Sequence, residues 1–316
     1  MAKLERPDIE WIAKNSNWGE KGISRALRGH VYADRAAWQR FLSLSTLSLG
    51  TAFGVAGIFF FFAHNWDALH RFTKLGLLEG FLILLILGLW ILKPNPLAKK
   101  VLLLAASLMI GALYAVYGQV YQSGADAYEL FLIWALMVLP WTLLANFTPL
   151  WLLQIVLLNL ALIQYADQGA APWVESHIQT LLILMNGLLL IAFESLPRML
   201  RIQPWPIWLL RVLALFILAV ALTDLPLKII DGTLDRYWIE LLVVVFFLAL
   251  GLWHGLQGKQ AFYPASVFFG IILLISALML RISDEAPMIL AIGLFIVVSN
   301  GLLVKTLLQL QRKWKK

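Results

Sequence analysis

The sequence predicts an all-α, polytopic integral membrane protein with about ten transmembrane helices and a short helical segment before them. Blocks of mostly apolar residues follow one another from Phe41 to Val304, with short loops between them. Each block is long enough to cross about 30 Å of hydrocarbon. The chain is 61% hydrophobic and only 14% charged, whereas soluble domains carry roughly 25% charged residues. These observations indicate a protein that folds in lipid.

The apolar blocks divide the chain into a cytoplasmic helical segment (1–41), a transmembrane bundle (42–304) and a basic cytoplasmic tail (305–316). Asn146 separates two adjoining blocks, because Pro149 suits the first turn of a new helix. If these two blocks form one broken segment, the count becomes nine. The predicted spans are 42–63, 72–92, 101–119, 127–145, 147–165, 178–194, 205–223, 238–254, 262–281 and 287–304.

The first segment predicts two short helices. Pro7 and Asp8 are typical of a helix start, and residues 15–19 interrupt the pattern. A second, basic helix is expected from Ser24 through Arg40. Such a hairpin can lie on an anionic leaflet, where each cation near the surface contributes about 1 kcal/mol. The alternative is a docking site for a cytoplasmic partner.

Positive charge predicts the orientation. With ten spans and a cytoplasmic N-terminus, 20 of the 25 Lys and Arg residues lie on the inner side. That bias follows the positive-inside rule, and it accounts for the net charge of +7 without nucleic-acid binding. Both termini are therefore expected in the cytoplasm. The cations on the outer side are Arg71, Lys74, Lys228, Arg236 and Arg281.

Glu79 is the clearest carboxylate within a predicted span. A charge at the centre of a membrane helix costs about 2.5–3.5 kcal/mol on insertion scales, so this group needs a partner, water or a proton. It is either a buried hydrogen-bonding link to the next helix or a carboxylate that binds a proton or substrate.

Further polar and aromatic residues border Glu79 on the outer side. Tyr114, Tyr117 and Tyr121 are spaced to share a helix face, although an interfacial aromatic belt also explains some of these residues. We expect the group to line one substrate-binding site, here called the predicted outer pocket. Its members are Asn65, Trp66, Asp67, Glu79, Tyr114, Tyr117, Gln119 and Tyr121.

Other polar residues predict structural roles. A solvated ion-pair cluster is expected of Glu194, Arg198 and Arg201. A solvated loop is expected to contain Asp224, Lys228, Asp231, Asp235 and Arg236. Glycines 50, 54 and 57 in the first span predict close helix packing. Interhelical hydrogen bonds are expected from Gln154, Asn159, Asn186 and Asn300.

Known catalytic motifs do not occur in this sequence. The chain has no cysteine, which excludes thiolate metal sites and cysteine nucleophiles. The five histidines are not spaced as metal ligands. We therefore expect no catalytic residue, metal or cofactor, although an enzymatic role stays open.

Two short motifs resemble a known family. Ala63-x-Asn65-Trp66-Asp67 closes a glycine-rich span, and Tyr121-Gln122-Ser123-Gly124 precedes Leu130-Phe131 and Trp134. Both are similar to motifs of the bacterial membrane-protein family called domain of unknown function 2157, over about residues 20–145. The resemblance implies a bacterial inner-membrane protein and no established activity.

The leading hypothesis is a protein that binds or transports a small polar solute or lipid head group through the predicted outer pocket. The alternative is a non-catalytic assembly factor or sensor that acts through a membrane-protein partner. An intramembrane transferase is a third class, which the short loops disfavour. Ten spans also permit two inverted five-helix repeats. The expected partners are membrane lipids.

Overall fold

The structure is a computed structural model that describes residues 6–16, 19–65, 69–91, 96–122, 124–168, 171–201 and 203–314. Throughout these ranges the regular structure is helical, with no strand. The chain divides into two compact units, Met1–Tyr121 (unit 1) and Gln122–Lys316 (unit 2). The predicted helical fold class is confirmed.

Unit 1 begins with two helices that pack on each other, α1 and α2. The prediction of a single second helix from Ser24 through Arg40 is wrong. α2 ends at His30, and Arg35–Arg40 belong to the next helix. The side chain of Asp34 explains this start, because its Oδ1 accepts a hydrogen bond of 2.7 Å from the Ala37 amide and so caps an orphan donor. The bounds are α1 Arg6–Asn15, α2 Glu20–His30, α3 Arg35–Asn65, α4 Arg71–Ile91 and α5 Pro96–Tyr121.

Two of the three long helices of unit 1, α3 and α4, pack against the third, α5. Leu78 of α4 is buried against Met109, Ala112 and Val116 of α5. The glycine face of α3 is different. A Cβ atom at Gly50, Gly54 or Gly57 would meet nothing within 4 Å, so the close packing expected there is not found among the described residues.

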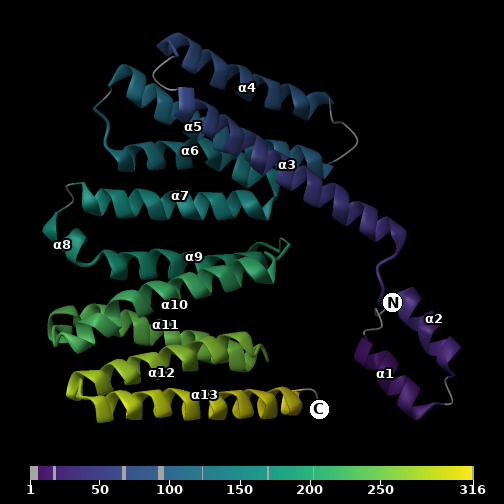
Figure 1. Cartoon of the computed structure of the whole chain (residues 1–316), viewed down its shortest axis with the longest axis vertical. Coiled ribbons are helices and arrows are strands. Elements are labelled where there is room, and N and C mark those ends of the chain that lie inside the picture. The colour runs from purple at the N-terminus through teal and green to yellow at the C-terminus, as the bar shows by residue number, and fades with distance from the viewer. Residues whose placement is uncertain are drawn as a thin grey trace. The chain divides into compact units, whose positions relative to one another are not determined.

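Unit 2 consists of long helices that lie side by side with roughly parallel axes (Figure 1). α6 packs on α7, α7 on α9, and α12 on α13. In between, α9 and α12 each contact both α10 and α11. The bounds are α6 Ala127–Ala145, α7 Thr148–Asp167, α8 Pro172–Ser176, α9 Ile178–Leu200, α10 Ile207–Ile230, η1 Leu234–Tyr237, α11 Trp238–Gln257, α12 Phe262–Ile282 and α13 Ala286–Trp314.

Asn146 divides α6 from α7, as the sequence predicts. Its φ of 44° and ψ of 55° place it in the left-handed region, which Asn tolerates better than most residues. Pro149 then lies in the first turn of α7, where its missing N–H leaves no helix bond unmade. The two helices are therefore separate.

Nine helices of the described residues are long and apolar enough to cross a membrane. They correspond to every predicted span except the first. That span, 42–63, lies within the 31-residue helix α3, whose side chains are described only in part. The last helix continues to Trp314, so residues 305–314 of the expected basic tail are helical and continue the helix of the final span. The chain is a multi-pass membrane protein.

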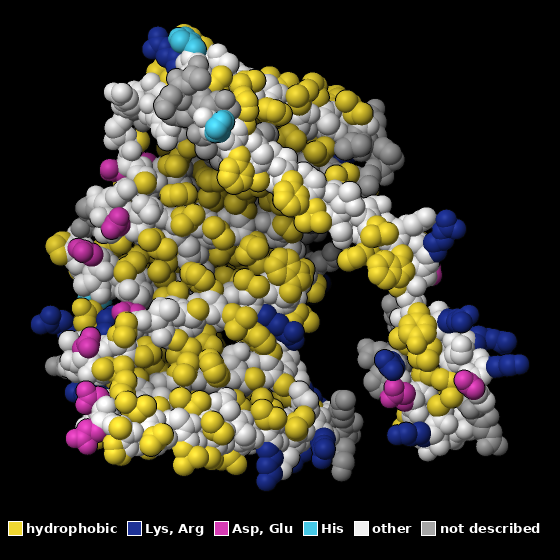
Figure 2. Space-filling view, in the orientation of Figure 1, with side chains coloured by type: hydrophobic (Ala, Val, Ile, Leu, Met, Phe, Trp, Pro, Cys, Tyr) yellow, Lys and Arg dark blue, Asp and Glu magenta, His cyan; other side chains and the backbone are white. Residues whose placement is uncertain are grey.

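Charged side chains separate to the two ends of the unit 2 helices. Figure 2 shows Asp and Glu gathered mainly at one end, Lys and Arg mainly at the other, and apolar side chains between them. We call these the acidic end and the basic end. The acidic end carries Asp126, Asp167, Glu175, Asp231 and Asp284, and the basic end carries Arg198, Arg211, Lys259, Lys305 and Arg312.

Buried amides join the helices α6, α7 and α9. Asn159 and Asn186 donate to each other's side-chain oxygen, at 3.1 and 2.7 Å. Gln154 donates to the Ala135 carbonyl of α6 at 3.1 Å. These interhelical bonds confirm the sequence prediction. The interhelical bond predicted for Asn300 is wrong, because its amide donates to the Ile296 carbonyl within α13.

Candidate ion-binding site in helices α9 to α12

A buried polar cluster lies where α10 and α11 approach the acidic end. α10 extends to Ile230, one to two turns beyond the predicted end of this span. Asp224 and Lys228 therefore lie one turn apart on a helix, and the solvated loop expected for them is wrong. Glu240 lies in the first turn of α11. These three residues are called the triad.

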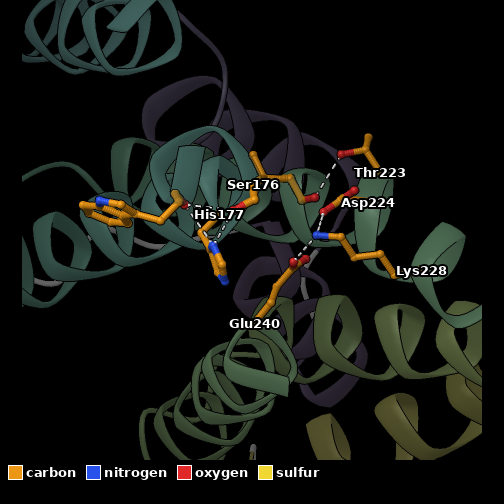
Figure 3. A network of polar contacts seen from close by, with 8 residues as sticks. Ser176, His177, Thr223, Asp224, Lys228 and Glu240 are labelled. Atoms are coloured by element: carbon orange, nitrogen blue, oxygen red, sulfur yellow. Dashed lines mark hydrogen bonds and ion pairs between the residues drawn. The ribbon is translucent and has the colours of Figure 1, made fainter. Parts of the chain in front are cut away.

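The lysine of the triad bridges two carboxylates (Figure 3). Its Nζ lies 2.5 Å from Glu240 Oε2 and also contacts Asp224 Oδ2. The Lys228 side chain is 12% exposed, Asp224 is 20% exposed and Glu240 is fully buried. Burial of this kind requires pairing, because desolvating an ion costs several kcal/mol.

The pairing within the triad is incomplete. Glu240 Oε1 is buried and has no hydrogen-bond partner among the described residues. Two carboxylates and one ammonium leave a formal charge of −1. Two other cations of this end, Arg236 and Arg281, are both exposed. A proton or a monovalent cation would complete the charge balance.

Aromatic and hydroxyl side chains border the triad. Lys228 Nζ lies 3.9 Å from the centre of the Tyr237 ring, a cation–π distance. The His177 ring lies 5.9 Å from that of Tyr237, and its Nδ1 is 2.9 Å from Ser176 Oγ. Tyr237 and His177 thus connect the triad to the loops of the acidic end, and Figure 3 shows His177 and Ser176 beside the triad.

A second polar group lies at the basic end of the same helices. Glu194 Oε1 on α9 is 2.9 Å from His254 Nε2 on α11 and 3.3 Å from Arg198 Nη2. The expected ion pair with Arg198 is confirmed. It is only partly solvated, because Glu194 is 22% exposed while Arg198 is 74% exposed. We call Glu194 and His254 the His254 pair.

A narrow cavity of about 90 Å³ begins at the His254 pair and extends into the helices. Tyr263 of α12 lines it beside the pair, with ring centres 5.0 Å from His254. Its other end is lined by Ile183, Ala221 and Val244, which belong to one buried apolar cluster. This apolar layer lies about one helical turn from Asp224 and Glu240, and it separates the cavity from the triad.

The structure describes only part of the predicted outer pocket. Trp66 and Asp67 lie outside the described residues, and so does the side chain of Asn65. Glu79 is exposed on α4, since its neighbour Leu78 takes the buried position.

The tyrosines of the predicted outer pocket are partly brought together on α5. Tyr117 and Tyr121 are exposed, with ring centres 4.6 Å apart. Gln119 is exposed and Tyr114 is half-buried. No contact between Glu79 and these side chains is found among the described residues, so a shared pocket stays a prediction.

A larger apolar cavity lies within unit 1, between α3, α4 and α5. Its volume is about 580 Å³. No described member of the predicted outer pocket lines it, and its walls are mainly apolar side chains and the glycine face of α3. They include Gly54, Gly57, Phe61, Leu77, Phe81 and Met109.

Sequence reasoning missed the triad and the cavity beside it. Asp224 and Lys228 have the spacing of a helical ion pair, and this signal could have extended the span. Glu240 follows the predicted start of its span at 238 by two positions, so its depth could have been noticed. The contact between α10 and α11 could not be read from spacing.

Comparison with known families bears on the first half of the chain. Residues 24–151 match the family model described as predicted membrane protein (DUF2157). The match confirms the sequence resemblance for α2 to the start of α7, which is less than half of the chain. The triad and the His254 pair lie beyond the matched residues. No curated protein and no solved structure matches the chain.

Proposed function

We propose that this chain is a transporter of a small polar solute in the bacterial cytoplasmic membrane, driven by a cation that binds the triad. Both termini lie in the cytoplasm in this proposal. The concentration of Lys and Arg at the basic end of unit 2 supports that orientation. The acidic end, with the triad, then faces outward.

The observation that carries the proposal is the unpaired, fully buried oxygen of Glu240. Ionisable residues within membrane helices are rare, and they mark ion pathways and proton relays. A purely structural bundle would lose nothing if these three residues were apolar, because a buried ion pair is often no better than an apolar packing.

The triad has two states that differ by one positive charge. Without a bound cation, Lys228 is shared between Asp224 and Glu240. With a proton or a monovalent cation on Glu240, Lys228 needs only Asp224 as its partner. Because Asp224 and Lys228 lie on α10 and Glu240 lies on α11, cation binding changes the attraction between these helices.

A second function is favoured by the exposure of Glu79. α4 buries only Leu78 among its described residues, and a carboxylate facing lipid is unfavourable. A membrane-protein partner that covers α4 would supply a polar contact for Glu79. This supports an assembly factor or sensor, or a head-group contact in the predicted outer pocket.

The test uses the purified full chain in proteoliposomes adsorbed on a solid-supported membrane. Rapid jumps of H⁺ or Na⁺ concentration are expected to evoke a transient current. Glu240→Gln removes the cation site and nearly keeps the side-chain shape, so its current is expected to fall at least about tenfold. A wild-type protein that gives no current with either ion would contradict the proposal.

A further inference from the structure

We infer that the driving cation is a proton and that the His254 pair is its second binding station, at the opposite end of helices α9 to α12. This inference rests on the proposed function and names the ion. Its basis is a titratable pair that lines a cavity aimed at the triad.

The chemistry of the pair suits a proton better than a metal cation. His254 Nε2 is 2.9 Å from Glu194 Oε1, so a protonated imidazole would contact the carboxylate directly. Histidine is the side chain that most readily gains and loses a proton near neutral pH. A metal cation would have to compete with Arg198, which already contacts the same carboxylate oxygen.

The groups that face His254 come from every helix packed against α11. Glu194 and Arg198 face it from α9, and Tyr263 faces it from α12. From α10, Arg211 stacks on the ring of Phe262 at 5.2 Å, next to Tyr263.

The geometry connects the two stations through α11. His254 and Glu240 are separated by about 21 Å along that helix, at 1.5 Å per residue. The cavity covers about 15 Å of this length, from His254 to Val244. Its polar end can hold water, because Glu194, His254, Tyr263 and Ser266 line it.

The apolar layer of Ile183, Ala221 and Val244 closes the remaining turn. A proton taken up by Glu240 from the acidic end passes to His254 only when this layer opens. It then leaves to the basic end from the His254 pair. Only N–H and O–H bonds are made and broken, and the proton gradient and the membrane potential supply the driving force.

The test measures proton flux in proteoliposomes that contain a trapped pH-sensitive dye, with a potassium diffusion potential set by valinomycin. Wild-type protein is expected to acidify the lumen. His254→Gln keeps a polar side chain beside Glu194 but does not titrate, and its proton flux is expected to fall at least about tenfold. His30→Gln is the matched control, because His30 is exposed on α2.

A second readout separates a relay role from a structural role. Dicyclohexylcarbodiimide modifies protonated carboxyl groups in apolar surroundings, and mass spectrometry locates the product. Labelling of Glu240 is expected to be the same in wild type and His254→Gln. Loss of both labelling and flux would show a structural role for His254 and overturn the inference, as would wild-type flux in His254→Gln.

The ion jumps distinguish the two proposals. Currents evoked by Na⁺ without proton flux would overturn this inference and leave the proposed function intact. If neither ion evokes a current, both fail. Glu194→Gln offers a second variant should His254→Gln misfold, and its proton flux is also expected to fall at least about tenfold, because the pair loses its carboxylate.

Discussion

Glu79 in unit 1 and Glu240 in unit 2 are both carboxylates on predicted membrane helices, but their surroundings differ. Glu79 is exposed on a helix that buries one described residue. Glu240 is fully buried, bound to Lys228 and left with one free oxygen. Burial with incomplete pairing, rather than a carboxylate in a span, marks the stronger candidate for ion binding.

The two units also differ in packing. Phe247 of α11 fills the space where a Cβ of Gly187 would lie, at 2.0 Å, so α9 and α11 approach closely. On α3, the corresponding space beside Gly54 is open. Helices α9 and α11 of unit 2 are therefore in close contact at Gly187, whereas the glycine face of α3 borders an open apolar cavity.

The largest effect is expected on the cation-evoked current when the buried carboxylate, Glu240, is replaced and the exposed one, Glu79, serves as the comparison. Glu240→Gln is predicted to reduce the cation-evoked current at least about tenfold, while Glu79→Gln keeps most of it. Currents on a solid-supported membrane measure both. The opposite result, loss only in Glu79→Gln, would transfer the site to the predicted outer pocket.

The next largest effect concerns stability. Lys228→Ala leaves Asp224 and Glu240 buried without their cation, and removing one partner of a buried pair costs about 3–5 kcal/mol. Thermal unfolding of the detergent-solubilised protein should show a clear decrease in Tm. A triple replacement of the triad with Leu, Met and Leu is expected to recover stability without recovering current, and equal Tm values for wild type and Lys228→Ala would argue against the burial.

A smaller effect is expected at the close helix contact. Gly187→Ala adds a methyl group where the Phe247 ring lies, and overpacking of this kind costs about 1–3 kcal/mol. Gly54→Ala is the matched control and should leave stability nearly unchanged, as measured by thermal unfolding. Equal changes in Tm for the two variants would contradict the difference in helix packing between the two units.

The smallest effect is expected from the amide pair. Asn186→Ala removes the reciprocal bonds with Asn159, and an interhelical hydrogen bond in a membrane contributes about 0.6 kcal/mol on average. A double-mutant cycle of Asn159 and Asn186 measures the coupling. Asn300→Ala removes a bond that stays within α13, so it should show no coupling to Asn159 or Asn186. A coupling energy as large as that of the amide pair would contradict the distinction between interhelical bonds and bonds within one helix.

Much of the fold could be predicted because lipid imposes one simple requirement, an apolar stretch of about 20 residues per crossing. The break at Asn146 followed from Pro149 and the turn chemistry of Asn. The end of α10 was placed too early because charged residues were read as a loop. Asp224 and Lys228 neutralise each other on one helix face, and so they extend the helix.

The site could be predicted less well because it depends on contacts between helices. Hydropathy indicates that Glu240 enters a span, but not that Lys228 of another helix reaches it. The same limitation applies to Glu194 and His254, which lie far apart in the sequence and meet across α9 and α11. The predicted outer pocket relied on placing its residues at the same side of the membrane, and two of them, Trp66 and Asp67, lie outside the described residues.

The most direct test of the central claim is carbodiimide labelling of the full chain in its native membrane, with mass spectrometry of both glutamates. The account predicts a modified Glu240 whose labelling decreases as the pH is raised, with little modification of Glu79. Modification of Glu79 alone, or of Glu240 to the same extent at every pH, would contradict the claim that the triad takes up a proton.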